Sequence, residues 1–508
     1  MPNLVIGVDV GTSSTKTLLT NTHGEVLAST RWEYPMYRPY PGWAENDPDD
    51  WVDAVESSVR LVIEQAMIDP ARVKGICIVA QRDPSVLLDE RQQVLTPSIS
   101  WIDRRDLDEA EQVYDEFDRK RLIETTGLVP VPALPLPNIY WIRRHKPDIW
   151  SQTRRILAPK DYVLLRLTGK VATDISTPSR SMLYDLRKRN WSEWICQKAG
   201  IDIGLLPPVV FHPWDVWEEL SPTAARRLGL FPGTILAAGG GDDPCAALGA
   251  GAIEVGDTAV GTGTATCWRA VTDRVEPDLS SRADLSPHVV PGRYVYELVV
   301  TGTGTSLRWF KDTFGARSVE TQDTYQSLLQ EASQAPAGSD GLFYYPYLEG
   351  ARAPHFNDDA TGVFFGILGS HTRAHCIRAI LEGIAFQYPP VLRLIEHYSG
   401  KVPNTIILVD DEARNPLWNQ IKADVTGRVI QTPKVLYAAA MGAAILASLA
   451  AGLFPNAAAA VHEMIKPGES YLPNPNNQEI YRQALDRYER VYAYLNNAFR
   501  SVKRSVPA

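Results

Sequence analysis

Apolar runs alternate with amphipathic stretches along the chain. One apolar run, NLVIGVDV, covers Asn3–Val10, and another, VKGICIVA, covers Val73–Ala80. Short apolar runs bounded by polar turns are typical of buried strands, whereas the stretch from about residue 106 to residue 121 has the spacing of a helix. This alternation predicts an α/β protein whose sheets are covered by helices. Because 508 residues exceed what one hydrophobic core usually fills, we expect two large domains or more.

One short pattern occurs twice. VIGVDVGTSSTKTLL, at Val5–Leu19, and DTAVGTGTATCWRAV, at Asp257–Val271, both predict a strand, a tight turn of Gly with Thr and Ser, and a second strand. Small residues in such a turn let phosphate oxygens approach the backbone amides. A single turn of this kind is commonly only a hairpin, but the pair predicts a duplicated domain that closes on one polyphosphate.

Two charged residues flank the first of these turns. Asp9 ends the first predicted strand, where a carboxylate can hold a magnesium ion against phosphates. The alternative for Asp9 is a capping role in a hairpin. Lys16 follows the turn and either faces the phosphates or lies in solvent.

A second pair of acids lies in TILAAGGGDDPCAALGAG, at Thr234–Gly251. An apolar strand is followed there by three glycines, by Asp242 and Asp243, and by a helix that opens at Pro244. Helix capping explains one Asp and the Pro. Because three glycines exceed what capping requires, we expect a substrate to approach the backbone here. A carboxylate at this point could accept the proton of an attacking hydroxyl, as phosphoryl transfer requires.

Two other segments have an unusual composition. GLVPVPALPLPN, at Gly127–Asn138, is rich in proline and predicts an ordered loop rather than a regular helix. YAAAMGAAILASLAAGLF, at Tyr437–Phe454, is long enough to suggest a membrane span. Because it is rich in alanine rather than leucine, it favours a tightly packed buried helix.

Charge and cysteine content narrow the class of function. The formal net charge of −9 argues against nucleic-acid binding, which needs a basic face. The five cysteines are scattered and form neither a zinc-binding nor a disulfide pattern. The first residues have neither the basic leader nor the small-residue cleavage site of a secretory signal. We therefore expect a cytoplasmic protein with no membrane and no nucleic-acid partner.

A third acidic cluster stands in IILVDDEARN, at Ile406–Asn415. A predicted strand is followed at once by Asp410, Asp411 and Glu412. Taken alone, three carboxylates at the end of a strand suggest either a divalent metal site or a solvated acidic turn.

A series of motifs, spread over nearly the whole chain, occurs in an order and spacing that is specific for one family. The motifs are GVDVGTSSTK, PGWAENDPDDW (Pro41–Trp51), SWIDRR (Ser100–Arg105), PKDYVLLRLTG (Pro159–Gly169), GGGDDPCAALGAG, VGTGTA, YPYLEGARAPH (Tyr345–His355), TGVFFGIL (Thr361–Leu368) and LEGIAFQ (Leu381–Gln387). In these motifs the chain resembles the FGGY carbohydrate kinases of the actin, Hsp70 and sugar-kinase superfamily, and within them the xylulokinase-type pentulose kinases.

The resemblance implies an α/β fold of two ribonuclease-H-like domains with the active site in the cleft between them. Residues 1–245 would form the N-terminal domain, with the sugar site and the first phosphate turn. Residues 246–508 would form the C-terminal, nucleotide-binding domain with a helical C-terminal end. The cofactors implied are ATP and Mg²⁺, and a homodimer is expected.

The resemblance also assigns roles to single residues. Asp242 would be the general base toward the sugar hydroxyl, Asp243 would touch the sugar, and Asp9 would take the magnesium position. The nucleotide would contact Gly11, Thr12, Ser13 and Lys16 in the first half, and Gly261, Thr262, Gly263, Thr264, Gly302 and Thr303 in the second.

The sequence departs from the xylulokinase pattern after the strand ICIVA. Xylulokinases usually have QMHG there, whereas this chain has QRDP, that is Gln81, Arg82 and Asp83 before Pro84. QRDP is more similar to the QRE of glycerol kinases, in which Arg and Glu bind hydroxyls of a polyol. The motif WIDRR, which contributes Trp101 and Asp103, also resembles the glycerol-kinase version. These five residues, Gln81, Arg82, Asp83, Trp101 and Asp103, are the predicted sugar contacts together with Asp243.

The acidic cluster is the second departure. The family has Gly-Gly-Gly-Ala after the strand equivalent to TIILV, in a turn against which the nucleotide lies. Here Asp410, Asp411 and Glu412 occupy the glycine positions and Ala413 is retained. We therefore expect the four residues to contact the nucleotide and to weaken or alter its binding, since a carboxylate about 5 Å from a phosphate costs ~3 kcal/mol at an effective dielectric constant near 20.

The sequence thus predicts an ATP-dependent kinase for the terminal hydroxyl of a pentulose, with D-xylulose, giving D-xylulose 5-phosphate, placed first. Another linear ketose or polyol, of the ribulose, erythritol or glycerol type, is the closest alternative. A catalytically impaired sugar or nucleotide sensor is a second alternative, and an actin-like assembly protein is a third.

Overall fold

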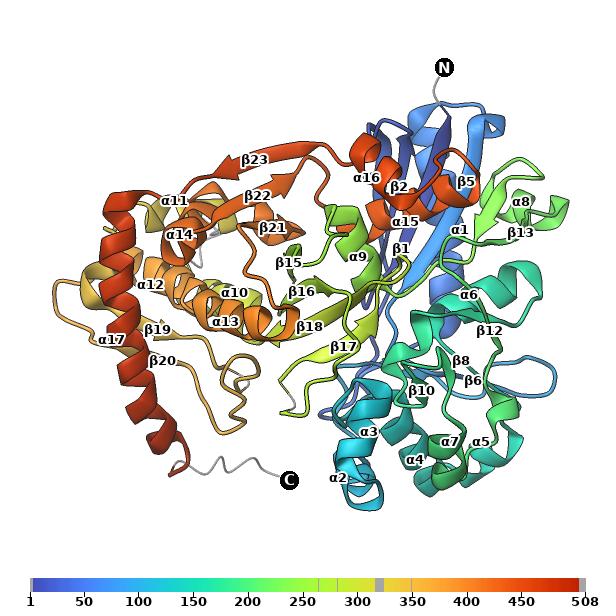
Figure 1. Cartoon of the computed structure of the whole chain (residues 1–508), viewed down its shortest axis with the longest axis horizontal. Coiled ribbons are helices and arrows are strands. Elements are labelled where there is room, and N and C mark those ends of the chain that lie inside the picture. Colours follow the sequence, from blue (N-terminus) through green and yellow to red (C-terminus); the bar gives the residue numbers. More distant parts are fainter. Residues whose placement is uncertain (1–2, 264, 281, 316–323, 349, 502–508) are drawn as a thin grey trace. The chain divides into compact units, whose positions relative to one another are not determined.

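A computed structural model describes residues 3–263, 265–280, 282–315, 324–348 and 350–501 (Figure 1). The chain divides into two compact units. Unit 1 comprises Met1–Ile253, Val271–Val295 and Tyr437–Lys466, and unit 2 comprises Glu254–Ala270, Tyr296–Leu436 and Pro467–Ala508.

The first large sheet has the strand order β13-β14-β5-β1-β2-β3. Its strands are β1 (Leu4–Val10), β2 (Ser14–Asn21), β3 (Val26–Glu33), β5 (Val73–Ala80), β13 (Val216–Glu219) and β14 (Ile235–Ala237). β1 runs antiparallel to β2 and parallel to β5, and β14 is parallel to β5. Every residue of β1 is buried, as expected for a central strand covered on both faces.

The second large sheet has the order β17-β18-β16-β15-β21-β22-β23. Its strands are β15 (Thr258–Thr262), β16 (Thr266–Thr272), β17 (Asp284–Pro287), β18 (Tyr294–Val300), β21 (Thr405–Val409), β22 (Val429–Pro433) and β23 (Pro467–Tyr471). β15 is antiparallel to β16 and parallel to β21, β21 is parallel to β22, and β22 is antiparallel to β23.

The run β16-β15-β21-β22-β23 repeats the order and the strand directions of β2-β1-β5-β14-β13. The predicted α/β class and the predicted duplication are therefore confirmed. In this correspondence β5 is the counterpart of β21, so the loop after β5 and the loop after β21 occupy equivalent places in the two sheets.

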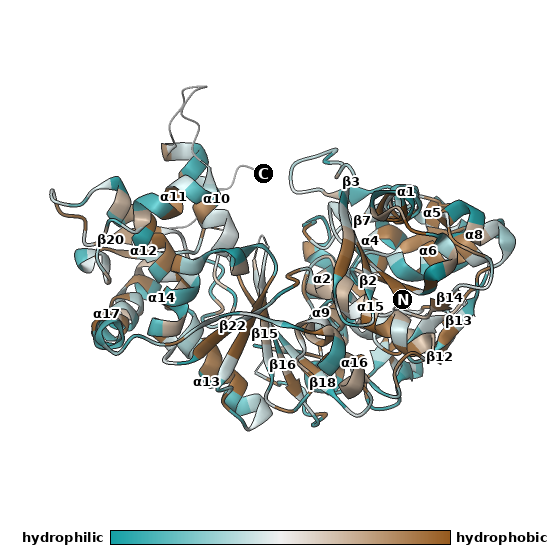
Figure 2. Ribbon diagram, turned by 90° about the horizontal axis from the view of Figure 1, so that it is seen from above, coloured by the Kyte–Doolittle hydropathy of each residue, from teal (hydrophilic) through white to brown (hydrophobic). Residues whose placement is uncertain are grey.

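Helices surround both sheets. The helices that begin in unit 1 are α1 (Pro48–Ala66), α2 (Leu107–Glu116), α3 (Arg119–Thr126), α4 (Pro135–His145), α5 (Pro147–Gln152), α6 (Pro159–Thr168), α7 (Glu193–Ala199), α8 (Pro222–Leu228), α9 (Asp242–Ala250), α15 (Ala438–Ala450) and α16 (Ala457–Met464). Those of unit 2 are α10 (Thr303–Phe314), α11 (Tyr325–Ala332), α12 (Arg373–Ala385), α13 (Tyr388–Ser399), α14 (Pro416–Thr426) and α17 (Pro475–Phe499). In Figure 2 apolar residues, in brown, are plain in strands such as β15, whereas helices such as α12 and α17 show both brown and teal.

Short strands and 3₁₀ helices complete the loops. The strand pairs are β4 (Glu45–Asn46) with β7 (Ser98–Ile99), β6 (Val86–Leu88) with β8 (Arg155–Leu157), β9 (Thr173–Asp174) with β12 (Val209–Phe211), β10 (Tyr184–Asp185) with β11 (Asn190–Trp191), and β19 (Phe343–Tyr345) with β20 (Val363–Phe365). The 3₁₀ helices are η1 (Pro70–Arg72), η2 (Thr177–Arg180), η3 (Ile203–Leu205), η4 (Ser339–Gly341) and η5 (Asp411–Arg414).

Helix α15 packs against α9 with the backbones in contact. A Cβ atom on Gly249 of α9 would overlap the carbonyl oxygen of Ala438, and one on Gly442 of α15 would overlap that of Cys245. A Cβ atom on Gly7 of β1 would likewise overlap the carbonyl oxygen of Ala440. The prediction of a buried helix within 437–454 is confirmed. None of the helices in the described part of the chain combines the length and apolar character needed to cross a bilayer.

Two local predictions were wrong in part. The stretch 106–121 is not one helix, because Phe117 is extended and the Asp118 carboxylate accepts a hydrogen bond from the Arg121 N–H, which starts α3. The proline-rich segment is a loop from Gly127 to Leu134, as predicted, but its last residues belong to α4, which begins at Pro135. Proline is tolerated in the first turn of a helix, where its missing N–H would have no helical partner.

Candidate functional site

The turn between β1 and β2 is tight and is held from outside. The Gly11 N–H donates to the Ser14 carbonyl at 3.1 Å. The Gln81 side-chain amide donates to the Gly11 carbonyl at 3.2 Å, and the Trp101 indole N–H donates to the Thr12 hydroxyl at 2.8 Å. Two predicted sugar contacts, Gln81 and Trp101, thus touch the predicted phosphate turn.

Gln81 also has a free acceptor. Its side chain is buried, and no group in the described part of the chain donates to its Oε1 atom. Because buried polar atoms in proteins are nearly always bonded, this oxygen is a natural point of contact for a hydroxyl or a bound water. Ser13, the third turn residue, accepts from the Tyr34 N–H through its carbonyl at 3.1 Å.

Asp9 and Lys16 face each other across the turn. They are paired residues of the β1–β2 ladder, and Asp9 is only 8% exposed. The Lys16 ammonium lies 5.4 Å from the ring centre of Tyr437. Among the described residues no group of three or more His, Cys, Asp or Glu side chains could hold a metal ion. A single buried carboxylate beside a phosphate turn still fits Mg²⁺, which keeps several waters and is commonly held by one or two carboxylates and the substrate phosphates.

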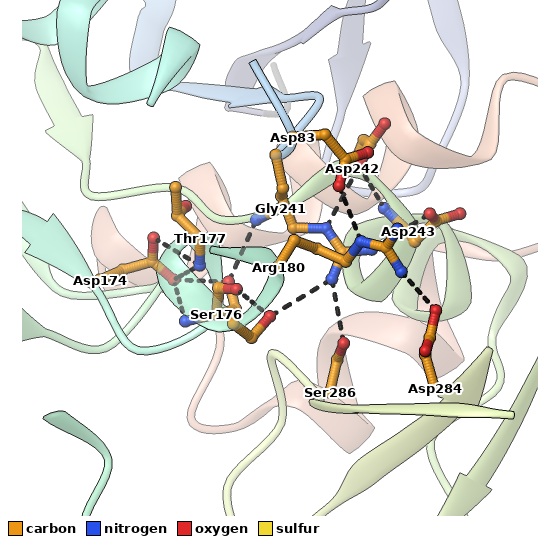
Figure 3. Close-up of polar contacts among 12 residues, drawn as sticks. Asp83, Asp174, Ser176, Thr177, Arg180, Gly241, Asp242, Asp243, Asp284 and Ser286 are labelled. Carbon is orange, nitrogen blue, oxygen red and sulfur yellow. Dashed lines mark hydrogen bonds and ion pairs between the residues drawn. The ribbon is translucent and has the colours of Figure 1, made fainter. Parts of the chain in front are cut away.

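Asp242 and Asp243 form the first turn of α9 and share one cation (Figure 3). The Arg82 Nη2 atom donates to Asp243 Oδ2 at 3.1 Å, and Arg82 Nε lies 3.6 Å from Asp242 Oδ1. Burial raises the pKa of Asp242 well above its ordinary value, and the nearby Asp243 and Asp9 carboxylates add to this shift, while Arg82 opposes it. A carboxylate with a raised pKa takes up a proton more readily, which suits a general base.

Arg82 is enclosed by the protein. Its side chain is buried, and the Nη1 atom donates to the hydroxyls of Ser286 at 3.2 Å and Ser179 at 3.4 Å. A Cβ atom on Gly241 would overlap the Arg82 side chain, so glycine is needed there for this packing.

The other two glycines before Asp242 also serve internal packing. A Cβ on Gly239 would overlap the Ile78 carbonyl, and one on Gly240 would come within 2.7 Å of the Ser176 hydroxyl. Internal packing thus explains why glycine stands at these positions. The expectation that a substrate approaches the backbone here stays a prediction.

Asp83 belongs to a second arginine cluster that the sequence did not reveal. Arg180 Nε donates to Asp83 Oδ1 at 2.8 Å, and its Nη1 donates to Asp284 Oδ2 at 2.6 Å (Figure 3). Arg180 and Asp284 lie 97 and 201 residues from Asp83 in the sequence. No local motif could have indicated that they meet.

Asp103 lies fully inside the protein. Its oxygens accept from the backbone N–H of Ala44 at 2.5 Å and from the N–H and guanidinium of Arg105. Arg105 in turn stacks over the Trp43 ring at 3.6 Å. Asp103 therefore holds the loop that carries Trp101. The predicted contact between Asp103 and the sugar stays a prediction.

The second turn lies between β15 and β16. The Thr262 and Thr266 hydroxyls are 2.6 Å apart, and the Gly263 N–H donates to the Ala265 carbonyl at 3.1 Å. Thr264 lies outside the described residues. A side chain on Gly263 would meet no described atom within 4 Å, so its backbone is open to a ligand.

Gly302 and Thr303 open α10. Gly302 has a left-handed backbone, with φ of 77°, and a Cβ there would overlap the Pro346 carbonyl. Thr303 is fully buried, and no group in the described part of the chain bonds its hydroxyl.

The acidic cluster after β21 separates into three different environments. Asp410 has φ of 63° and ψ of −162°, and its carboxylate occupies the space that a Cβ on Gly261 would need. Asp411 is exposed and pairs with Arg414 at 3.5 Å.

Glu412 turns inward, and Ala413 beside it is also buried. Glu412 is 7% exposed and forms an ion pair with Lys422 of α14, which has no exposed surface. Of the three acids, Asp410 is thus the one that lies against the second turn.

Comparison with known proteins gives a consistent assignment. The N-terminal domain of the FGGY family of carbohydrate kinases matches residues 4–249, and its C-terminal domain matches residues 258–451. The xylulose kinase of Bacillus subtilis (strain 168) is 31% identical over 504 residues, which cover 99% of each chain. The gluconokinase of the same organism is 29% identical over 508 residues, 99% of this chain and 98% of the relative.

A solved structure agrees with these matches. The crystal structure of xylulose kinase from Rhodospirillum rubrum superimposes with a TM-score of 0.88 at 29% identity, over 98% of this chain and 100% of that chain. The two-unit α/β architecture described above is thus that of a carbohydrate kinase, a phosphotransferase. The chain belongs to the FGGY family of carbohydrate kinases.

Proposed function

We propose that the protein phosphorylates the terminal hydroxyl of a pentulose with ATP and Mg²⁺, and that D-xylulose, giving D-xylulose 5-phosphate, is its substrate. The observation that carries the proposal is the Asp242 carboxylate at the start of α9, which is 31% exposed, lies 3.6 Å from the buried Arg82 guanidinium, and has a pKa raised by desolvation and by the Asp243 and Asp9 charges. The named xylulose kinase relatives support the choice of sugar.

In the proposed reaction Asp242 accepts the proton of the sugar's terminal hydroxyl, and the oxygen attacks the γ-phosphorus of ATP in line with the leaving ADP. Arg82 holds the Asp242 and Asp243 carboxylates in place, and Gln81 Oε1 accepts a hydrogen bond from the sugar. Mg²⁺ held by Asp9 would neutralise charge that develops on the phosphate oxygens.

The two predicted domains divide the ligands in this proposal. Residues 1–245 bind the sugar and, through Gly11–Ser13 and Lys16, the end of the triphosphate. Residues 246–508 bind the nucleotide through Gly261–Thr264, Gly302 and Thr303, with Asp410 beside them. A cytoplasmic homodimer completes the proposal, and five free cysteines fit a reducing compartment.

The charges around Asp242 favour a neutral sugar over a sugar acid such as gluconate. Asp83, Asp243 and Asp284 bring three further carboxylates, and each of the two arginines, Arg82 and Arg180, is already bonded to carboxylates. A substrate carboxylate entering here would meet repulsion without an uncommitted arginine to offset it.

The test is ADP release by the purified protein with MgATP. The panel contains D- and L-xylulose, D- and L-ribulose, gluconate, glycerol, erythritol and erythrulose, with Asp242→Asn as the control. Turnover of D-xylulose that is lost in Asp242→Asn is expected. Preference for gluconate or a polyol would overturn the substrate, and a folded wild-type protein that binds sugar but turns over none of the panel would favour the sensor.

A further inference from the structure

A fully buried chain of polar contacts runs from the interior of unit 1 to the residue before Asp242. Lys160 of α6 donates to Asp161 Oδ1 at 2.8 Å and to the Ala238 carbonyl at 3.1 Å, and its ammonium lies 3.3 Å from Asp174 Oδ1. Asp174 accepts from both the N–H and the hydroxyl of Ser176. The Gly241 N–H then donates to the Ser176 hydroxyl at 3.1 Å.

The direction of each hydrogen bond in this chain is fixed by chemistry. The Gly241 N–H can only donate, so the Ser176 oxygen must accept. The single proton of that hydroxyl is thereby left for Asp174, which as a carboxylate can only accept. Burial alone would lower the pKa of Lys160, but the Asp161 and Asp174 carboxylates outweigh it and keep the pKa above its ordinary value, so the cation is retained.

The start of α9 has no cap from its N-cap residue, Gly241, which carries no side chain. Within the first turn the Asp243 N–H donates to the Asp242 carboxylate itself, at 2.9 Å. The residues before the helix are instead held by other elements: Lys160 donates to the Ala238 carbonyl. The Ser176 hydroxyl accepts from the Gly241 N–H (Figure 3). Gly240 lies so close to the Ser176 hydroxyl that a Cβ would come within 2.7 Å of it.

We propose that Lys160, Asp174 and Ser176 form a positioning relay that fixes the backbone from which the Asp242 side chain starts. No side chain of the relay is itself a proposed sugar or phosphate contact, although Asp243 starts from the same turn as Asp242. Loss of the relay should therefore lower kcat much more than it raises the KM for the sugar. This inference rests on the proposed role of Asp242 as general base.

The test compares Ser176→Ala with Ser181→Ala. Both serines are buried in the same segment, but the Ser181 hydroxyl donates to the Pro178 carbonyl at 2.7 Å and accepts from the Leu183 N–H, with no contact to α9. We expect Ser176→Ala to lower kcat by about tenfold to a hundredfold, since small misplacements of a catalytic group are this costly. The KM for sugar should change by less than about threefold, and Ser181→Ala should resemble the wild type.

Repeating the substitution in a variant that lacks the base separates an effect on the position of Asp242 from a general weakening of the fold. In Asp242→Asn, where the base is absent, adding Ser176→Ala should lower the residual kcat by less than about twofold, because residues that act as one unit are not additive. An undiminished tenfold loss in that background, or equal kinetics for Ser176→Ala and Ser181→Ala, would overturn the relay.

Hydrogen exchange tests the relay without turnover. The amides of the segment 239–245 should exchange faster in Ser176→Ala than in Ser181→Ala and the wild type. If the wild type phosphorylates none of the sugars, the proposed function fails. The exchange rates of Ser176→Ala and Ser181→Ala would still show whether Ser176 holds the start of α9. Unchanged exchange in Ser176→Ala would show that Ser176 does not hold the start of α9.

Discussion

The loops that follow β5 and β21 occupy equivalent places in the two repeated sheets, and each turns one charged residue into its own unit. After β5 the inward residue is Arg82, which meets the carboxylates of Asp242 and Asp243. After β21 it is Glu412, which pairs with Lys422. The two loops thus use charges of opposite sign for one purpose, which is to fasten the loop to a neighbouring helix.

The two anchors differ in the roles of their partners. Arg82 binds carboxylates that we place in catalysis, so replacing Arg82 changes both the anchoring of the loop and the reaction. Glu412 pairs with a lysine inside unit 2, whereas the Asp410 carboxylate lies against Gly261 and Asp411 is exposed. An acid-rich run after a strand is therefore not one site, because each residue of the run can have a separate partner.

The largest effect on stability is expected at Glu412. Glu412→Leu leaves the Lys422 side chain buried without its counter-charge, where burial lowers the pKa of Lys422 well below its ordinary value. Removing one partner of a buried pair typically costs about 3–5 kcal/mol of unfolding free energy. The double variant Glu412→Leu with Lys422→Met removes both charges and should recover most of that loss. Urea unfolding of the three proteins measures it. A single variant as stable as the wild type would show that the pair does not anchor the loop.

The next effect is expected at Arg82 and should appear in catalysis. Arg82→Met removes the cation that opposes the raised pKa of Asp242, so that pKa rises further and the base is protonated at higher pH. The acid limb of the kcat profile should move to higher pH, and kcat at neutral pH should fall by about a hundredfold or more. Arg82→Lys keeps the charge and should restore the pH limb in part. A profile that does not move in Arg82→Met would contradict the coupling.

These anchors mark the limit of what the sequence could predict. The strands, both Gly turns and the pair Asp242–Asp243 follow from patterns within about twenty residues, since local periodicity and turn chemistry produce them. Arg180, Asp284, Lys160, Asp174 and Ser176 could not be predicted, because each acts through partners brought together only by the tertiary fold. The inward turn of Glu412 was missed for a different reason, because its partner Lys422 is close in the sequence but the pairing depends on how α14 packs after the turn and not on a regular spacing.

Asp410 should show a smaller effect that has two separable parts. Its φ of 63° with ψ of −162° lies in a region that glycine alone adopts easily, at a cost of about 1–3 kcal/mol. Asp410→Gly removes both the strain and the charge, whereas Asp410→Asn removes only the charge. We expect Asp410→Gly to raise the unfolding free energy and both variants to lower the KM for ATP.

The exposed Asp411 provides the matched control for Asp410. Asp411→Asn removes a charge at the next position, where the pair with Arg414 is exposed and contributes little. It should leave both stability and the KM for ATP nearly unchanged. If Asp410→Gly and Asp410→Asn also left the KM for ATP unchanged, the carboxylate would not face the nucleotide.

Asp106 sharpens the comparison as a buried carboxyl group that no described cation pairs with, and its effect should be the most gradual. It is fully buried, and both of its oxygens accept from the Ala133 N–H at 3.0 Å. Burial raises the pKa of Asp106 to about 7. The folded protein holds the Asp106 proton more tightly than the unfolded chain, and this difference stabilises the folded state. The stabilisation is fully present below the unfolded pKa near 4 and is lost as the pH rises through 7. The unfolding free energy falls by no more than about 1.4 kcal/mol per pH unit from this source.

Asp106→Asn isolates that contribution, because the amide oxygen can still accept from Ala133 but the group no longer titrates. The unfolding free energy of the wild type minus that of Asp106→Asn should fall between pH 4 and pH 7.5, as measured by urea unfolding in matched buffers. A difference that stays constant, or that grows with pH, would mean that Asp106 is charged in the folded protein. It would then behave as Arg82 and Glu412 do, and its counter-charge would have to be sought by mutating the cations nearest to it.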